Sequence, residues 1–200
     1  MSFKIKVTFY NSFKIGDNVN YNLDILNYLY ELLEQSSSKK DLLYKPIIVS
    51  NVSIIEAILA DFFKRINTNY VEGVPNLGEV FDSLRGKKIS DFRKYLIQAE
   101  KEDLFDQGSV SNLHEILLYL QAVRNRVHIQ DFYRHKEIQG KLSKNDKNVF
   151  IEKYKRSSER CLEFLIKKMN EKYPRPEHTH HVDDHALPWE EHFPNFPDLE

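Results

Sequence analysis

The chain has 200 residues, a length that suits one domain with a short appendage. Its hydrophobic fraction of 41% and charged fraction of 30% are ordinary for a soluble globular protein. The single cysteine, Cys161, excludes an intramolecular disulfide and a cysteine-based metal site. The first residues lack a signal-peptide core, and no apolar run approaches membrane-spanning length. We therefore expect a cytoplasmic protein with no membrane partner.

The net charge of −1 hides an uneven distribution. Residues 124–173 contain 14 Lys and Arg against 7 Asp and Glu, whereas residues 174–200 contain 1 against 7. A basic segment suits a polyanionic partner such as RNA. The alternative is a solvated helix face rich in Lys and Glu.

Residues 1–18 are predicted to form strands that pack on the remaining chain. Apolar side chains at Phe3, Ile5, Val7 and Phe9 alternate with polar ones, which is the period of a strand. Asn11 and Ser12 suit a turn into a second strand that starts at Phe13, which predicts a small β-hairpin.

Residues 19–173 are predicted to form a helical domain, so the fold class is mainly α. A helical stripe runs from Leu23 to Leu33. Pro46 suits a helix start, and the residues from Ile47 to Asn67 are apolar on more than one side, so this helix is expected at the centre of the fold. Its β-branched residues leave a strand from Pro46 to Val52 as an alternative.

Glu56 interrupts this central apolar helix. A buried carboxylate needs a partner or a raised pKa. Either the side chain reaches the surface or it pairs with a buried cation, for which we favour Arg124.

Later segments show further helix patterns. A short helix is expected near Glu79 to Leu84, and Ser90 is predicted to cap a helix that continues to about Leu104. Ser111 is predicted to cap the next helix, and a long final helix is expected from about Lys144 to Lys172.

Residues 174–200 form an acidic tail rich in His and Pro, predicted to be irregular. Its apolar residues Trp189, Phe193 and Phe196 lie in an acidic, Pro-rich context that resembles a docking segment for a protein partner. A second hypothesis makes the tail a latch over the basic segment, released when its histidines gain protons.

The run Arg124-Asn125-Arg126-Val127-His128 follows an apolar helical stretch. If the helix continues, Arg124 and His128 lie four residues apart on one face. A guanidinium fits a phosphate, and an imidazole moves protons near neutral pH. The pair could therefore bind and cleave a phosphodiester. The alternative is that Arg124 pairs with an acid and His128 is an ordinary histidine.

The apolar helix with Glu56, followed by the Arg124–His128 motif and a long final helix, resembles the HEPN superfamily over roughly residues 23–173. These HEPN proteins are compact helical bundles found in prokaryotic toxins, defence systems and RNA-processing factors. The usual signature has a longer gap than the three residues between Arg124 and His128. The chain is similar to the shorter Arg-Asn-Xaa-Val-His form.

The resemblance implies a metal-independent endoribonuclease that acts as a homodimer and needs no cofactor. His128 would be the general acid or base for attack by a ribose 2′-hydroxyl, and Arg124 would stabilise the phosphate. Asn125 would orient the phosphate or cap the helix, with Glu56 and Arg126 in supporting roles.

Two other functions stay open. One is a non-catalytic HEPN-like module that dimerises and binds RNA, nucleotide or protein. The other is an antitoxin-like or adaptor role in which the tail docks on a partner.

Overall fold

The computed structural model describes residues 3–5, 13–36, 38–68, 83–84, 86–87, 89–105, 112–125, 152–173 and 185–192. Over these ranges the protein is mainly helical, as predicted. The longer described elements are five helices and two three-residue strands: β1 (Phe3–Ile5), α1 (Phe13–Gln35), α2 (Lys40–Thr68), α4 (Phe92–Lys101), α5 (Leu113–Asn125), α7 (Glu152–Lys172) and β2 (His185–Leu187).

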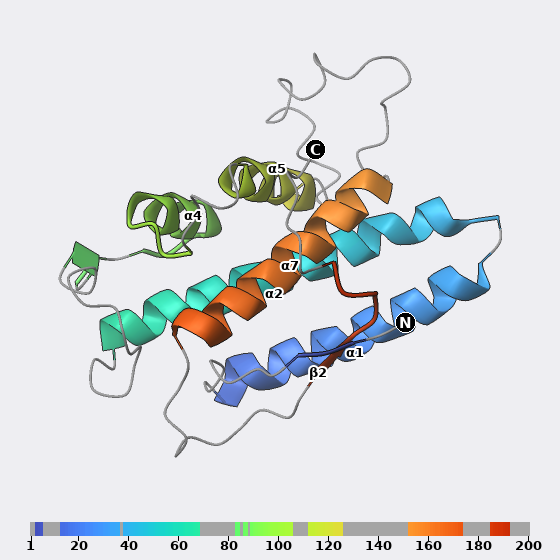
Figure 1. The fold of residues 1–200 in the computed structure, drawn as a ribbon, viewed down its shortest axis with the longest axis horizontal. Helices are drawn as coiled ribbons and strands as arrows, with labels where there is room; N and C mark the ends of the chain where they lie inside the picture. The colour runs from blue at the N-terminus through green and yellow to red at the C-terminus, as the bar shows by residue number, and fades with distance from the viewer. Residues whose placement is uncertain are drawn as a thin grey trace, which may run out of the picture.

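Helix α2 lies at the centre of the described structure and packs against α1, α4, α5 and α7. Figure 1 shows α1 on one side of the α2–α7 pair and α4 with α5 on the other. Side chains on opposite sides of α2 are buried, among them Ile54 and Phe63, which are nine residues apart in the helix. Burial from several directions explains why the apolar residues of this segment are not confined to one stripe.

The central position of α2 also accounts for its hydropathy. By length and composition, Lys40–Ile66 could cross a membrane, with a mean hydropathy of 1.7, so the expectation that no apolar run reaches that length was wrong. In the structure 61% of the most apolar stretch is buried by the other elements. Burial against four neighbouring helices is sufficient to explain this apolar composition.

Helix α2 begins earlier than the sequence predicted. It starts at Lys40, so Pro46 lies inside the helix, and the alternative strand from Pro46 to Val52 is excluded. Asp41 lies in the first turn, where its negative charge favours a helix N-terminus.

Helix α4 is capped by Asp91 instead of the predicted Ser90. The Asp91 side chain accepts a hydrogen bond of 3.0 Å from the backbone N–H of Lys94. Asp91 has an extended backbone (φ −139°), as a cap residue requires. The proposed cap Ser111 and the expected start of the last helix at Lys144 lie outside the described residues.

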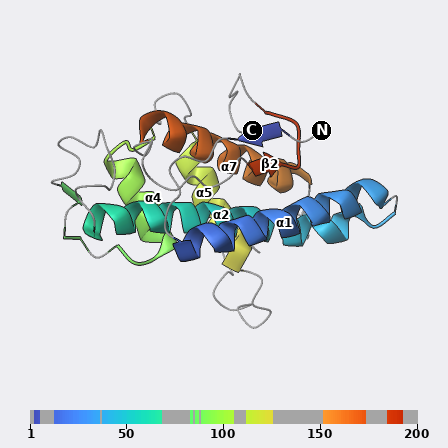
Figure 2. The same cartoon turned by 90° about the horizontal axis from the view of Figure 1, so that it is seen from below.

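The predicted N-terminal hairpin is not confirmed, because Phe13–Ile15 form the first turn of α1. Strand β1 instead pairs antiparallel with β2, with Phe3 opposite Leu187 and Ile5 opposite His185. The two ends of the chain therefore share one small sheet beside α1, which Figure 2 shows from below.

The tail was expected to be irregular, yet residues 185–192, here called the C-terminal strap, carry core side chains. Leu187 and Trp189 are 1% and 5% exposed, in the same core as the helices. Trp189 lies against Tyr30 of α1, with 5.6 Å between ring centroids. Apolar burial therefore holds this part of the tail on the helical bundle.

Candidate functional site

Arg124 is placed by the packing of α5. The buried residues Leu113, Leu117, Leu120 and Val123 form one helical stripe. Arg124 follows the last of them, one residue before the helix ends at Asn125. Its side chain is 26% exposed, so it lies at the edge of the core and reaches solvent.

Glu56 of α2 forms an ion pair with Arg124, which confirms the predicted partner of this acid. The guanidinium Nη2 donates to the Glu56 Oε2. The Glu56 side chain is 32% exposed, so neither charge is sealed from water. The contact fixes the guanidinium relative to the central helix.

The ring of Phe92 provides a second support for the Arg124 side chain. The guanidinium carbon lies 5.9 Å from the ring centroid of Phe92, the buried first residue of α4. This distance is within the range of a cation–π interaction. Helices α2, α4 and α5 thus converge on one guanidinium.

Only part of the Arg124 donor fork is open to a ligand. Its Nε is buried and has no hydrogen-bond partner among the described residues, while Nη2 donates to Glu56. Because a guanidinium carries five N–H donors and this side chain is 26% exposed, an oxyanion could bind N–H groups on its solvent side while the Glu56 contact persists.

Tyr95 of α4 lies near enough to Glu56 for the carboxylate charge to affect the pKa of its phenol. Burial is the largest cause that raises its pKa, followed by the negative charges of Glu56 and Asp91. The ring stacks on Phe63 of α2, with centroids 5.3 Å apart. Tyr95 therefore keeps its phenol proton over the physiological range and belongs to the packed wall near Glu56.

The other predicted site residues are only partly located. Asn125 is half-buried beside Arg124 at the end of α5. Arg126 and His128 lie outside the described residues, as do Phe193 and Phe196. Of the three proposed docking residues, Trp189 is buried in the chain's own core, so its anchor contact here is intramolecular.

A basic hollow of about 380 Å³ lies along the first half of α7. Its described lining consists of Glu152, Lys153, Arg156, Ser157 and Arg160. Glu152 is the only acid among them and pairs with Arg156 at 2.8 Å. The remaining cations, Lys153 and Arg160, give the described lining a net positive charge that suits an anionic ligand.

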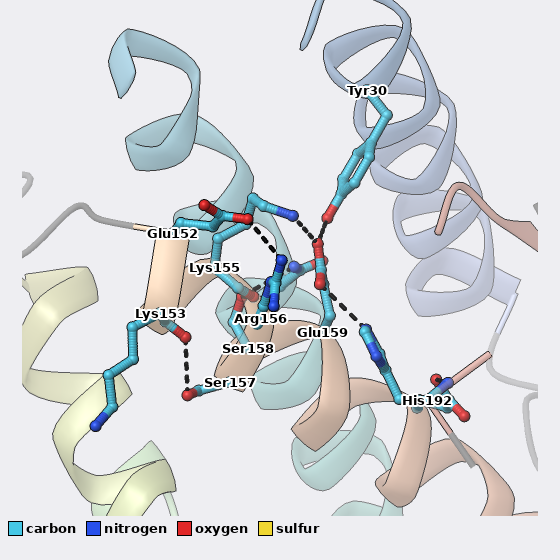
Figure 3. Close-up of polar contacts among 11 residues, drawn as sticks. Tyr30, Glu152, Lys153, Lys155, Arg156, Ser157, Ser158, Glu159 and His192 are labelled. Atoms are coloured by element: carbon cyan, nitrogen blue, oxygen red, sulfur yellow. Dashed lines mark hydrogen bonds and ion pairs between the residues drawn. The ribbon is translucent and has the colours of Figure 1, made fainter. Parts of the chain in front are cut away.

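A buried polar cluster around Glu159 of α7 was missed from the sequence. Figure 3 shows Tyr30, Lys155 and His192 converging on this carboxylate. Tyr30 donates its hydroxyl hydrogen to Oε1, Lys155 approaches the same oxygen at 2.6 Å, and His192 Nε2 lies 3.2 Å from Oε2.

The cluster keeps Glu159 ionised. Burial alone would raise the pKa of this carboxyl, but bonds from His192, Lys155 and Tyr30 outweigh burial and lower it. Burial, and then the negative charge of Glu159, raise the pKa of Tyr30 far above its ordinary value. The tyrosine is therefore a permanent donor and the glutamate a permanent acceptor at neutral pH.

The sequence did contain a signal for this cluster. Glu159 and Glu163 occur at helical spacing with Leu162 and Ile166, which are core residues of α7. Two acids within an apolar stripe indicate buried carboxylates that need donors. Glu163 is fully buried and pairs with Lys167 at 2.9 Å.

The strap, residues 185–192, lies on α1 and on α7, a helix of the basic segment, so the latch hypothesis stays a prediction. His192 contacts the acids Glu159 and Glu163, and Trp189 contacts α1. Glu191 of the strap pairs with Lys167 of α7, and burial of the apolar side chains of Leu187 and Trp189 adds to this seat.

No protein-family model matches this sequence, and neither the curated proteins nor the solved structures include a match to it.

Proposed function

We propose that the protein is a metal-independent endoribonuclease of HEPN type that cleaves RNA in a composite site between two copies. The observation that supports this most is the Arg124 guanidinium, held by Glu56 and Phe92 at the solvent edge, where its side chain is 26% exposed. A guanidinium that is fixed and partly exposed suits a phosphate that gains charge during a reaction.

The proposed reaction is an internal transfer at phosphorus. His128 removes the proton of a ribose 2′-hydroxyl, whose oxygen attacks the adjacent phosphorus. The bond from phosphorus to the 5′-oxygen then breaks, and the histidine of the second copy protonates that leaving oxygen. The products are a 2′,3′-cyclic phosphate and a 5′-hydroxyl.

Within this mechanism the residues of the chain have distinct roles. Arg124 binds the non-bridging phosphate oxygens and stabilises their increased charge in the transition state. Glu56 is a positioning residue because it acts through Arg124. The hollow lined by Lys153 and Arg160 would hold the RNA backbone away from the reacting bond.

Cleavage of RNA in EDTA by Arg124→Ala and Arg124→Lys tests this proposal. We expect at least about a 100-fold loss with alanine, as for removal of a single oxyanion donor. Lysine keeps the charge but loses the planar fork and should restore little. Arg93→Ala, at an exposed arginine of α4, is the control. Wild-type cleavage by a folded Arg124→Ala protein would refute the role.

A specific observation also supports the second function, a non-catalytic module that dimerises. Tyr21, Ile25 and Tyr28 form an exposed stripe on α1, with exposures of 67%, 37% and 60%. Their spacing places them on one helix face, and exposed aromatic residues are frequent at protein interfaces. This function predicts a stable dimer that cleaves no RNA, measured by light scattering alongside the cleavage assay.

A further inference from the structure

The seat of the C-terminal strap combines apolar burial with two buried acids. Trp189 and Leu187 bind through the core, whereas His192 binds through carboxylates. His192 uses two separate groups: its backbone N–H donates to Glu163 Oε2 at 3.1 Å, and its ring Nε2 lies 3.2 Å from Glu159 Oε2. One residue of the strap therefore meets both buried acids of α7.

His192 lies among both acidic and basic side chains. In the described residues its contacts, and the groups bonded to them, include three carboxylates: Glu159, Glu163 and Glu191. Two cations oppose them, since Lys155 pairs with Glu159 and Lys167 pairs with Glu163 and Glu191.

The remaining groups at this seat do not remove the excess. Tyr30 from α1 contributes a neutral hydroxyl, and Asn51 from α2 bonds the neutral Ser158 at 3.0 Å. Glu190 of the strap adds another acid on the exposed side. Among the described residues, the contacts of this cluster thus involve more carboxylates than cations.

We propose that residues 185–192 are a pH-responsive strap, whose seating on α1 and α7 tightens when the His192 ring takes up a proton. The sign follows from the contacts: a protonated ring forms an ion pair with Glu159, whereas a neutral ring retains only a hydrogen bond. Acid therefore closes the strap, and alkali loosens it. This is the reverse of a tail that histidine protonation releases.

Burial of the His192–Glu159 contact determines how strongly the charge of the ring affects the strap. Its Glu159 partner is 1% exposed on its side chain, and the His192 side chain is 21% exposed. Charge pairs are screened less when they are buried than when they are exposed. Protonation of His192 should therefore stabilise the seated strap more than protonation of a surface histidine would.

Trp189 is the only tryptophan of the chain, so its fluorescence reports the strap directly. In the full-length protein, acrylamide quenching of this emission should increase as pH rises from about 5 to 8, the range over which histidines titrate. The emission should shift to longer wavelength over the same range.

His192→Gln retains a donor at this position but cannot become charged. We expect its quenching to be independent of pH over this range and to resemble that of wild type at pH 8. The control is His114→Gln, which changes another histidine paired with a glutamate, at 2.8 Å from Glu100 and remote from the strap. This control should keep the wild-type pH dependence.

Each outcome decides the proposal. Quenching of the wild-type protein that does not change with pH would overturn it, as would the same pH dependence in His192→Gln. Loss of the pH dependence in His114→Gln would show a change of the whole fold and would also overturn it. If His192→Gln fails to fold, Glu159→Gln with the His192 ring intact provides the second test, because removal of its charge partner should also flatten the profile.

Discussion

Glu56 and Arg124 lie 68 residues apart in the chain and meet as an ion pair that connects the middle of α2 to the last turn of α5. In the proposed enzyme this contact aims the guanidinium at the phosphate. It also predicts how two substitutions at Glu56 differ.

Glu56→Gln should weaken RNA cleavage while leaving the fold intact. The pair is partly exposed, so its loss should reduce the free energy of unfolding by about 1 kcal/mol or less. Without the Glu56 charge the Arg124 guanidinium is less well positioned. This should lower kcat more than it raises KM, because the arginine acts mainly in the transition state. Glu56→Asp, which keeps the charge, should recover part of the rate in steady-state kinetics.

The matched control for this change is Glu31→Gln, at an exposed glutamate of α1. It should leave both kcat and the urea midpoint unchanged. If Glu56→Gln alters stability but not the kinetic constants, Glu56 is a structural residue without a role in positioning.

This pair also shows what the sequence could predict. An acid inside an apolar helix needs a cation, and few cations follow an apolar helical stripe, so Arg124 was a reasoned choice. The helical class was predictable because amphipathic periodicity is local. The cap at Asp91 and the start of α2 were missed, because neighbouring residues compete for the same terminal N–H groups and only geometry selects one.

Long-range pairings were not predictable in the same way. Strand β1 gives no indication that its partner is His185–Leu187, at the far end of the chain. Trp189 lies in an acidic, Pro-rich context that is typical of solvated tails, yet its ring packs on Tyr30. Pairings of this kind depend on how distant helices pack, and the sequence of one segment does not determine that packing.

Tyr30→Phe should destabilise the protein through the buried Glu159. Removal of the hydroxyl leaves the carboxylate one donor short, at an expected cost of about 1–3 kcal/mol in the free energy of unfolding. Urea denaturation followed by circular dichroism measures this cost. Tyr28→Phe, at a 60% exposed tyrosine of the same helix, should change the free energy by about 0.5 kcal/mol at most. Equal effects of the two changes would contradict the buried contact.

The lowered pKa of Glu159 predicts how stability depends on pH. A carboxyl whose pKa is lower in the folded state than in the unfolded state contributes stability above the unfolded value, about 4.3. That contribution is lost as pH falls through the folded pKa. The difference in unfolding free energy between wild type and Glu159→Gln should therefore shrink as pH falls from about 5 toward 3, below the unfolded pKa. A difference that stays constant would show that Glu159 does not titrate with folding.

The basic hollow of α7 predicts a change in RNA affinity without a loss of chemistry. Lys153→Ala combined with Arg160→Ala should weaken binding, and the slope of log K against log salt should fall by about 0.7 for each phosphate that the protein no longer neutralises. The control combines Lys39→Ala and Lys40→Ala, two exposed lysines of which the first precedes α2 and the second begins it. An identical salt slope in the hollow variant and wild type would exclude this surface as an RNA-binding site.

The most direct test of the proposed function is end-group analysis of RNA incubated in EDTA with wild-type protein and with His128→Ala. We predict that wild type produces 2′,3′-cyclic phosphate and 5′-hydroxyl ends, and that His128→Ala folds normally but produces neither. Equal cleavage by the folded variant, or wild-type products with 5′-phosphate ends, would contradict the account.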